Sequence, residues 1–346
     1  MTEAARPTHM LAEVEEIPAA AARFLDGARE AVAAAAAAMR AVDPGLVATV
    51  ARGSSDHAAT YLKYAIELAA GIPVASVGPS VASIYGRRLR FDGAACLGVS
   101  QSGRSPDIVE MMRSAREGGA LTIAIVNDAE SPLAAASDHA LALHAGAERS
   151  VAATKTFVVS ILAGLALLAA WRDDRALAAA VARLPEDFAR ALACDWTPLA
   201  DRLAEAGSLY VLGRGPGWAI ASEMALKFKE TCGMQASSYS AAEVLHGPSA
   251  IVGAGFPVLA LGVGDAALPQ LVATADRLAG QGAEVFLTAP GGGPGVTRLP
   301  AVEGLHPLTA PLALAPSFYR FIEGLARRRG LDPDAPPHLR KVTATL

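Results

Sequence analysis

The chain has 346 residues, of which 52% are hydrophobic and 18% are charged, and its formal net charge is −4. A chain of this length can form two domains, each with a core of ordinary size. The negative net charge argues against a nucleic-acid-binding protein, which would carry a basic surface, and against attachment to an anionic membrane.

Cysteine usage and the apolar segments indicate the compartment. Cys96, Cys194 and Cys232 have no metal-ligand spacing, so we expect neither a disulfide framework nor a zinc site. The N-terminal stretch carries Glu3, Glu13, Glu15 and Glu16 and lacks a basic segment followed by an apolar one, so we expect no secretory signal. The longest apolar run, residues 157–171, is shorter than the roughly 20 residues that span a membrane, so we expect a buried helix. These features predict a cytoplasmic protein.

The order of the expected elements is typical of an α/β protein. Helices come first, over residues 10–26 with a break at Pro18 and over residues 27–40. Strands then alternate with helices, and the strands are expected over residues 46–51, 74–77, 94–99, 121–126 and 141–144. Because parallel strands are joined by helical crossovers, this alternation predicts a doubly wound, flavodoxin-like sheet flanked by helices.

Small polar residues follow the strand expected over residues 94–99. Residues 100–107 read Ser-Gln-Ser-Gly-Arg-Ser-Pro-Asp, and a helical pattern comes next. A strand, a Ser/Gly loop and a helix N-terminus can bind phosphate, because free backbone N–H groups and the helix dipole face the anion. A helix cap formed by Ser102 or Ser105 is the alternative explanation. A second junction of this kind, with Ser54 and Ser55, follows the first strand.

The strand pattern repeats with a constant offset. The separation is 162 residues from Gly53 to Gly215, from Leu97 to Leu259 and from Thr122 to Glu284. One offset over three strands indicates two copies of one α/β unit. The second copy has Gly-Val-Gly-Asp at residues 262–265 in place of the phosphate loop, so we expect one phosphate site, in the first copy.

We therefore expect N-terminal helices, two domains and a C-terminal tail. Their ranges are residues 1–45, 46–195, 196–330 and 331–346. The linker between the two domains should lie in the helical stretch near residues 194–198.

Charged residues in the second copy form a possible proton-transfer set. Glu223, Lys227 and Glu230 are spaced to share one face of a helix. Glu243 and His246 follow, three residues apart, before a Gly-Pro turn. A solvated ion-pair face is the alternative, but the segment is otherwise rather apolar. A carboxylate, an ammonium and an imidazole around a phosphate-bound substrate can transfer protons.

These stretches together resemble tandem sugar isomerase (SIS) domains, over nearly the whole chain from residue 10 to residue 341. The matching stretches are residues 100–103, 151–155, 212–215, 225–230, 243–248 and 334–341. The chain is similar to the isomerase half of glutamine–fructose-6-phosphate amidotransferase and most similar to the stand-alone SIS-type (type II) glucosamine-6-phosphate deaminases. The resemblance implies two tandem SIS domains.

The resemblance also implies which residues bind the substrate. The phosphate ligands would be Ser55, Ser100, Gln101, Ser102 and Ser105. The sugar ligands would be the Glu148 carboxylate and the backbone at Val151 and Ala152.

The catalytic residues implied by the resemblance agree with the chemistry. Glu230 would move a proton between C1 and C2, which one carboxylate can reach in turn, and Lys227 would stabilise the charge of the intermediate. His246 would open the sugar ring and, in the family, reaches the site from the partner subunit of a homodimer. Lys341 would fold over the site on the C-terminal tail. We expect no metal or other cofactor.

The chain departs from the amidotransferase in three places. Thr2 stands where the amidotransferase has its glutaminase cysteine, so we expect that glutamine is not the ammonia donor through this chain. Arg104 stands where an acidic residue is usual, and Ala153 replaces a serine. Both changes leave the sugar specificity open.

The expected reaction is the isomerising deamination of glucosamine-6-phosphate to fructose-6-phosphate and ammonia. Galactosamine-6-phosphate deamination, fructosamine-6-phosphate deglycation and a synthase subunit fed with ammonia by a separate glutaminase would use the same groups. A sugar-phosphate-sensing regulatory module is the alternative from another class. Such a module usually follows a helix-turn-helix segment, and no basic stretch of that kind precedes residue 46.

Overall fold

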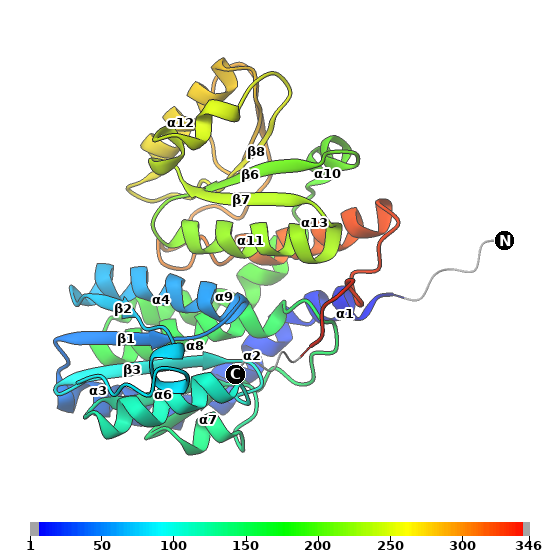
Figure 1. Ribbon diagram of the computed structural model, residues 1–346. Coiled ribbons are helices and arrows are strands. Elements are labelled where there is room, and N and C mark those ends of the chain that lie inside the picture. The colour runs from blue at the N-terminus through cyan, green and yellow to red at the C-terminus, as the bar shows by residue number, and fades with distance from the viewer. Residues whose placement is uncertain (1–6, 342–346) are drawn as a thin grey trace. The chain divides into compact units, whose positions relative to one another are not determined.

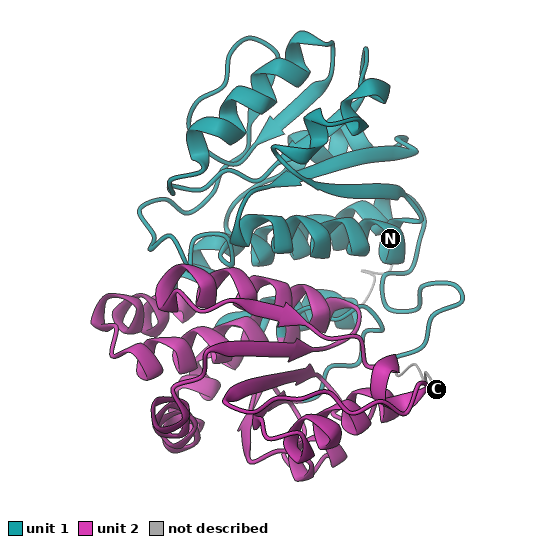
Figure 2. Cartoon of the chain, turned by 60° about the vertical axis from the view of Figure 1, so that its left-hand side comes forward, with its two compact units in different colours: residues 1–18, 147–155, 186–341 teal, residues 19–146, 156–185, 342–346 magenta. Residues whose placement is uncertain are grey.

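The computed structural model describes residues 7–341. Thr2 and the outer ends of the two predicted terminal segments, residues 1–6 and 342–346, lie outside the described residues. The described chain forms two compact units that interleave along the sequence (Figure 2). Unit 1 contains residues 7–18, 147–155 and 186–341, and unit 2 contains residues 19–146 and 156–185. The domain boundaries expected from the sequence stay a prediction.

Unit 2 is built on a parallel sheet of five strands in the order β2-β1-β3-β4-β5. Along the chain these strands are β1 (Leu46–Val50), β2 (Val74–Ser76), β3 (Ala94–Ser100), β4 (Leu121–Val126) and β5 (His139–Ala142). The crossover helices α4 (Ser54–Ala70) and α6 (Pro106–Glu117) lie on opposite faces of the sheet (Figure 1). The other helices are α2 (Ile17–Gly27), α3 (Arg29–Val42), α5 (Ser80–Ser83), α7 (Pro132–Ala135) and α8 (Lys155–Arg172), and α9 (Arg175–Leu192) begins in unit 2 and ends in unit 1.

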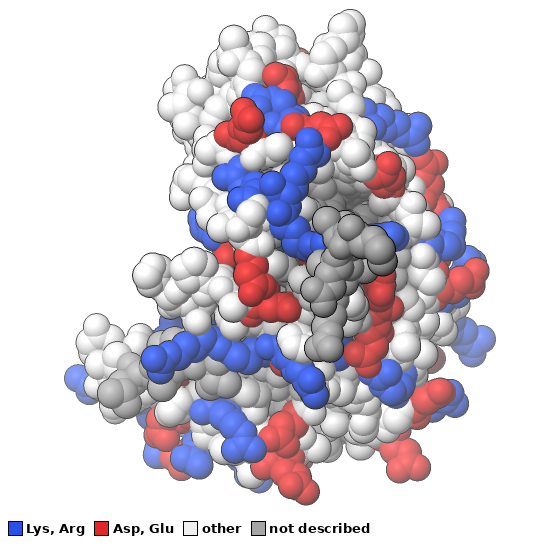
Figure 3. Space-filling view, turned by 90° about the vertical axis from the view of Figure 1, so that its right-hand side faces the viewer, with Lys and Arg blue, Asp and Glu red and all other residues white. Residues whose placement is uncertain are grey.

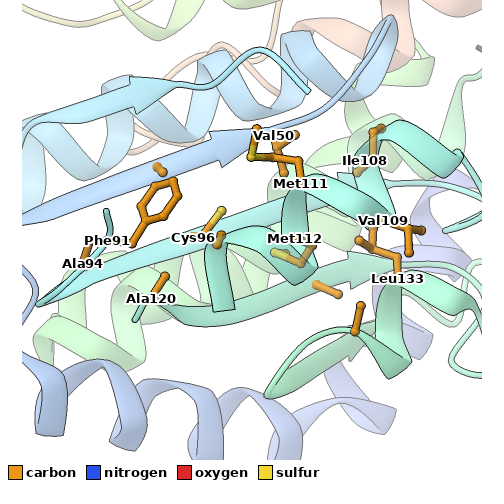
Figure 4. Packing of buried hydrophobic residues seen from close by; sticks show 14 of the residues in the cluster. Val50, Phe91, Ala94, Cys96, Ile108, Val109, Met111, Met112, Ala120 and Leu133 are labelled. Carbon is orange, nitrogen blue, oxygen red and sulfur yellow. The ribbon is translucent and has the colours of Figure 1, made fainter. Parts of the chain in front are cut away.

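The core under α6 fixes that helix at the end of β3. Met111 and Met112 of α6 pack against Val50 of β1 and Cys96 of β3, and all four are buried (Figure 4). Burying a side chain of this size stabilises the fold by roughly 1.5–3 kcal/mol. Every residue of β3 is buried, as expected for a central strand that helices cover on both faces.

Unit 1 repeats this architecture. Its strands, in the spatial order β10-β9-β8-β6-β7, are β6 (Ser208–Gly213), β7 (Gln235–Ser240), β8 (Pro257–Ala260), β9 (Glu284–Leu287) and β10 (Val296–Arg298). In both sheets the first strand lies between the second and the third. Gly53 and Gly215 have nearly the same backbone angles, φ 56° and 53° with ψ −134° in each. The predicted pair of α/β units is confirmed.

Two helices of unit 1 carry the side chains discussed below. α11 (Pro216–Cys232) packs against β6, β7 and α13 (Leu314–Arg328), whereas α12 (Leu268–Gly280) lies on the other face of the sheet (Figure 1). A Cβ at Gly213 would lie 2.3 Å from the carbonyl oxygen of Gly217, so α11 starts in close contact with β6. The remaining helices are α1 (His9–Glu15), α10 (Thr197–Leu203), and the short 3₁₀ helices η1 (Glu243–Leu245) and η2 (Pro248–Ile251).

Two predicted elements differ from the structure. The first helix breaks at Glu16, not at Pro18, because Pro18 lies in the first turn of α2, where a proline is favourable. Strand β5 starts at His139 rather than at residue 141. The Asp138 carboxylate accepts hydrogen bonds from the N–H and Oγ1 of Thr122 in β4, and so holds the chain beside β4 just before His139. The positive φ of His144 ends the extended backbone.

The apolar helix α8 is a core helix of unit 2. Among the described residues it is the one helix whose length and composition could cross a membrane, and 83% of its most apolar window is buried. A Cβ at Gly164 would lie 2.3 Å from Cδ2 of Leu62, so α8 and α4 approach each other closely. Burial of this extent is typical of a helix inside a folded core.

Charged side chains of both signs share the face drawn in Figure 3. Exposed ion pairs occur in the chain, such as that of Arg328 with Asp201, whose Nη1–Oδ1 separation is 2.5 Å. Exposed pairs contribute at most about 1 kcal/mol each. The mixture of signs on this face is in keeping with the small net charge of −4.

Candidate active site

The two Ser/Gly junctions of unit 2 lie side by side. Strands β1 and β3 are neighbours, and Val50 pairs with Gly98 near the ends of both strands. Arg52, just after β1, donates from Nη2 to Oδ2 of Asp107, in the first turn of α6, over 2.9 Å. The structure therefore brings Ser55, at the start of α4, to the same sheet edge as residues 100–105.

The loop after β3 is a tight turn that requires glycine. Oγ of Ser100 accepts a hydrogen bond from the N–H of Gly103 over 3.1 Å. Gly103 has φ +62°, and a Cβ there would lie 2.2 Å from Oγ of Ser131. Ser100 is buried, whereas Gln101 and Ser102 are half-buried at the rim of the turn.

The serines of this loop do not cap α6. Ser105 is the residue before the helix, yet among residues 7–341 no side-chain hydrogen bond from this position caps α6. Oγ of Ser102 instead accepts from the N–H of Arg104 over 3.3 Å. The Asp107 carboxylate accepts from the N–H of Ile108, and Arg52 offsets its charge. The alternative explanation of the motif as a simple cap is therefore wrong.

A buried ion cluster lies on α11. Nζ of Lys227 is 3.2 Å from Oε1 of Glu223 and 2.5 Å from Oε2 of Glu230. The side chains of Lys227 and Glu223 are 0% and 1% exposed, and that of Glu230 is 20% exposed. The helical spacing thus brings the three residues together as predicted, and the alternative of a solvated ion-pair face is wrong.

The charge of Lys227 is maintained by its partners. Burial alone would lower the pKa of Lys227, but the carboxylates of Glu223 and Glu230 outweigh that effect and raise the pKa above its ordinary value. The ammonium therefore stays charged at neutral pH. With both carboxylates ionised, the cluster carries a net charge of −1.

Tyr319 on α13 contacts the same cluster. Its hydroxyl donates to Oε1 of Glu223 over 3.0 Å, and its side chain is 0% exposed. Burial raises the pKa of Tyr319 well above its usual range, and the carboxylates of Glu223, Glu148 and Glu230 raise it further. Tyr319 is therefore a neutral donor close to the ion cluster and to Glu148. Tyr319 lies in none of the sequence motifs described above.

The loop of residues 147–155 and the C-terminal tail meet at Glu148. Oε2 of Glu148 accepts from Nζ of Lys341 over 3.0 Å, and Oε1 accepts from the N–H of Thr154 over 3.1 Å. Nζ of Lys341 also donates to the carbonyl oxygen of Ser150 over 2.7 Å. The structure therefore brings together two predicted site residues that are 193 positions apart.

The other two predicted sugar ligands lie on this loop. Ala152 is buried, and Val151 is half-buried. The backbone N–H of Val151 donates to the carbonyl oxygen of Asp334 in the tail over 3.3 Å. The loop and the tail are thus joined by their backbones as well as by Glu148 and Lys341.

Helix α1 also contacts the loop of residues 147–155 and the C-terminal tail. The Glu13 carboxylate accepts from the N–H groups of Arg149 and, over 3.3 Å, Ser150. The Asp334 carboxylate accepts from the N–H groups of His9 and Met10, each over 2.7 Å, in the first turn of α1. Glu13 is buried, and burial raises its pKa although the bond from Arg149 lowers it. Sequence spacing gave no sign of Glu13, because its partners are distant in the chain.

His246 lies elsewhere in unit 1. Its side chain is exposed at the end of η1, and the neighbouring Val244 packs into the core on the α12 face. This loop follows Ser240 of β7, which pairs with Gly213 just before α11 begins. Glu230 lies 14 residues beyond Pro216 along α11, a distance of about 20 Å. Within this chain the structure does not bring His246 to Glu230.

Among residues 7–341 no group of three or more His, Cys, Asp or Glu is arranged to hold a metal ion. The three cysteines are free thiols, and burial raises the pKa of Cys96 to about 12 and that of Cys232 to about 11.

We expect Glu13→Ala to lower the free energy of unfolding by about 1–3 kcal/mol, because two backbone N–H groups lose their acceptor. Glu15→Ala is the matched control, since Glu15 lies on the same helix with an exposed side chain. Urea unfolding of both variants measures the difference. Equal stability of the two variants would contradict the assigned contacts.

Curated relatives cover most of this chain. A glutamine–fructose-6-phosphate aminotransferase (isomerizing) of Aeropyrum pernix is 34% identical over an alignment of 360 positions, which covers 98% of this chain and 58% of the relative. That of Treponema pallidum is 31% identical over 85% of this chain and 51% of the relative. The chain thus spans about half the length of the curated relatives it matches.

Solved structures match over nearly their whole length. A candidate phosphosugar isomerase of Silicibacter pomeroyi is 54% identical, with a TM-score of 0.92 over 95% of this chain and 100% of that chain. A glucosamine-6-phosphate deaminase of Thermotoga maritima has a TM-score of 0.77 over 98% of this chain and 100% of that chain. Its identity is 22%, so it shows a shared fold.

The family model of the SIS domain matches both copies of the repeat. It covers residues 44–170, which include the Ser/Gly loop of residues 100–105, and residues 202–288, which include the ion cluster of α11. These matches cover more than half of the chain. The chain belongs to the SIS domain family.

Proposed function

We propose that this chain is a sugar-phosphate isomerase and that its reaction is the isomerising deamination of glucosamine-6-phosphate to fructose-6-phosphate and ammonia. The observation that carries the proposal is the contact of the buried Lys227 with the partly exposed Glu230. Membership of the SIS domain family and the 54% identity to a candidate phosphosugar isomerase support it.

Glu230 is proposed as the base. It takes the proton from C2 of the open-chain amino aldose and returns it to C1. The oxygen of C1 gains a proton and the amino nitrogen loses one, which leaves a hydroxymethyl group at C1 and a ketimine at C2. Water then adds to C2 and ammonia departs, so fructose-6-phosphate remains. The side chain of Glu230 is 20% exposed and can therefore contact a ligand. Lys227 is completely buried and acts through its charge.

Lys227 is proposed as the electrostatic partner of this step. Negative charge develops on the oxygen of C1 when the C2 proton leaves, and a fixed ammonium in a buried site stabilises that charge. The raised pKa of Lys227 keeps the ammonium protonated at the pH of the reaction. The wild-type enzyme should therefore lose no activity through deprotonation of Lys227 in the neutral pH range.

The phosphate group of the substrate is proposed to bind at the two junctions of unit 2. The uncapped N-terminus of α6 offers backbone N–H groups and the positive end of its dipole. The hydroxyls of Ser55, Ser102 and Ser105 are half-buried at the same sheet edge. Glu148, with its bond to Lys341, is proposed to contact the sugar hydroxyls.

His246 is proposed to open the sugar ring from the partner subunit of a homodimer. Two observations support this assignment: its side chain is exposed, and about 20 Å of helix separates the start of α11 from Glu230. An imidazole can serve both as acid and as base in ring opening.

Ammonia release from glucosamine-6-phosphate tests the reaction, with galactosamine-6-phosphate and fructosamine-6-phosphate assayed beside it. We expect release from the first substrate and a loss of about a thousandfold in kcat in Glu230→Gln, because an amide cannot accept the proton. Lys229→Gln, the exposed neighbour on α11, should stay active. Release from none of the three substrates would contradict the proposed reaction, and an active Glu230→Gln would contradict the assigned base.

Ser102→Ala and Ser105→Ala test the phosphate site. Each variant loses one hydrogen bond to a charged ligand, so we expect KM to rise about tenfold with little change in kcat. The inhibition constant of inorganic phosphate should rise in parallel. Ser137→Ala is the control, because its hydroxyl bonds to Leu133. Unchanged KM values in both loop variants would refute the assignment.

Mixing two inactive variants tests the contribution of His246. If each site combines Glu230 of one subunit with His246 of the other, Glu230→Gln and His246→Ala are inactive alone. Refolded together at equal amounts they should recover about a quarter of the wild-type activity, because half of the dimers contain one intact site. A mixture that stays inactive would show that both residues act from one chain.

A further inference from the structure

We propose that Tyr319 is a positioning residue of this reaction, whose hydroxyl keeps Glu223 and Glu230 ionised around Lys227. The inference rests on the proposed function, since Glu230 acts there as the base. No motif of the sequence pointed to this residue.

The geometry places two donors, the Tyr319 hydroxyl and the Lys227 ammonium, on one carboxylate oxygen of Glu223. Oε1 of Glu223 accepts from the hydroxyl of Tyr319 over 3.0 Å and lies 3.2 Å from Nζ of Lys227. All three side chains are buried. Hydrogen bonds in such surroundings are electrostatically stronger than in water. Tyr319 is thus fixed on α13 and contacts the ion cluster on α11 directly.

The charges around Tyr319 explain what its hydroxyl does. Glu223 and Glu230 on α11 contribute two negative charges, and Lys227 contributes one positive charge. From the loop of residues 147–155, Glu148 also faces Tyr319, while its own charge is paired with Lys341 of the tail. A neutral hydroxyl donor stabilises the net negative cluster, because it satisfies a carboxylate oxygen without adding charge.

Loss of this donor would make the cluster easier to protonate. With one hydrogen bond fewer, the ionised form of the two carboxylates is less stable, and their first protonation shifts to higher pH. Protonation of Glu230 removes the base. Protonation of Glu223 leaves the Glu230 carboxylate as the one negative partner of Lys227 in the cluster. Either event slows proton abstraction at acid pH.

Tyr319→Phe isolates the hydroxyl from the ring. The Tyr319 ring packs beside Phe318, with centroids 5.8 Å apart, and phenylalanine keeps that contact. Tyr210→Phe is the matched control, because Tyr210 is a buried tyrosine of unit 1 whose hydroxyl donates to the carbonyl oxygen of Pro248 over 3.0 Å, away from α11. Both variants lose a buried hydrogen bond, so both should lose some thermal stability.

The experiment measures kcat and KM for glucosamine-6-phosphate across the acid limb of the pH profile in the wild type and both variants. In Tyr319→Phe we expect the acid limb of the kcat profile to shift to higher pH by about one unit. At a fixed pH on that limb, this shift is a tenfold loss of kcat. KM should change less than twofold, because the side chain of Tyr319 is 0% exposed and offers no surface to a ligand. The profile of Tyr210→Phe should coincide with that of the wild type.

The outcomes separate this inference from the proposed function. An active wild type with an unmoved acid limb in Tyr319→Phe would refute the assigned role, whatever the loss of thermal stability. A wild type that releases no ammonia would contradict the function instead. In that case the pH dependence of unfolding tests the inference. The wild type should be more stable than Tyr319→Phe where the cluster is ionised, and the difference should vanish as the pH falls and the carboxylates protonate.

Discussion

The buried ammonium of Lys227 is the constraint on which the ion cluster of α11 in unit 1 depends. An unpaired charge in this position would cost several kcal/mol, so the fold must supply carboxylates within contact distance. Glu223 and Glu230 meet this need only while α11 stays a regular helix, because they lie four residues before and three residues after Lys227. The close approach of α11 to β6 and its packing against α13 keep the helix in place, and Glu230 remains partly exposed for chemistry.

A second set of contacts ties distant segments into the same unit. Glu13 holds the loop of residues 147–155, Lys341 closes on Glu148 of that loop, and Asp334 caps α1. These bonds explain why unit 1 contains three separate stretches of the chain. They also place a carboxylate of the loop near Tyr319, whose pKa responds to Glu148 as well as to the α11 cluster.

Features set by local sequence were predictable. The apolar strands, the Gly53 and Gly215 turns and the helical spacing of the α11 residues follow from a few neighbouring positions, and the structure confirms them. Tyr319 and Glu13 were not predictable, since their partners lie 96 and 136 residues away. Spacing also could not distinguish a buried charged face from a solvated one. His246 follows Glu230 closely in sequence, but the chain crosses the sheet through β7 between them.

Hydrogen exchange at C1 tests the central claim most directly. Fructose-6-phosphate and ammonium are incubated with the enzyme in heavy water, because the proposed proton transfer at C1 takes place on the C2 ketimine, and the C1 protons are followed by NMR. If Glu230 moves a proton between C1 and C2, the wild type should replace one of the two C1 protons stereospecifically, and Glu230→Gln should replace neither. Absence of exchange in the wild type, or equal exchange in the two proteins, would contradict the assignment of Glu230 as the base.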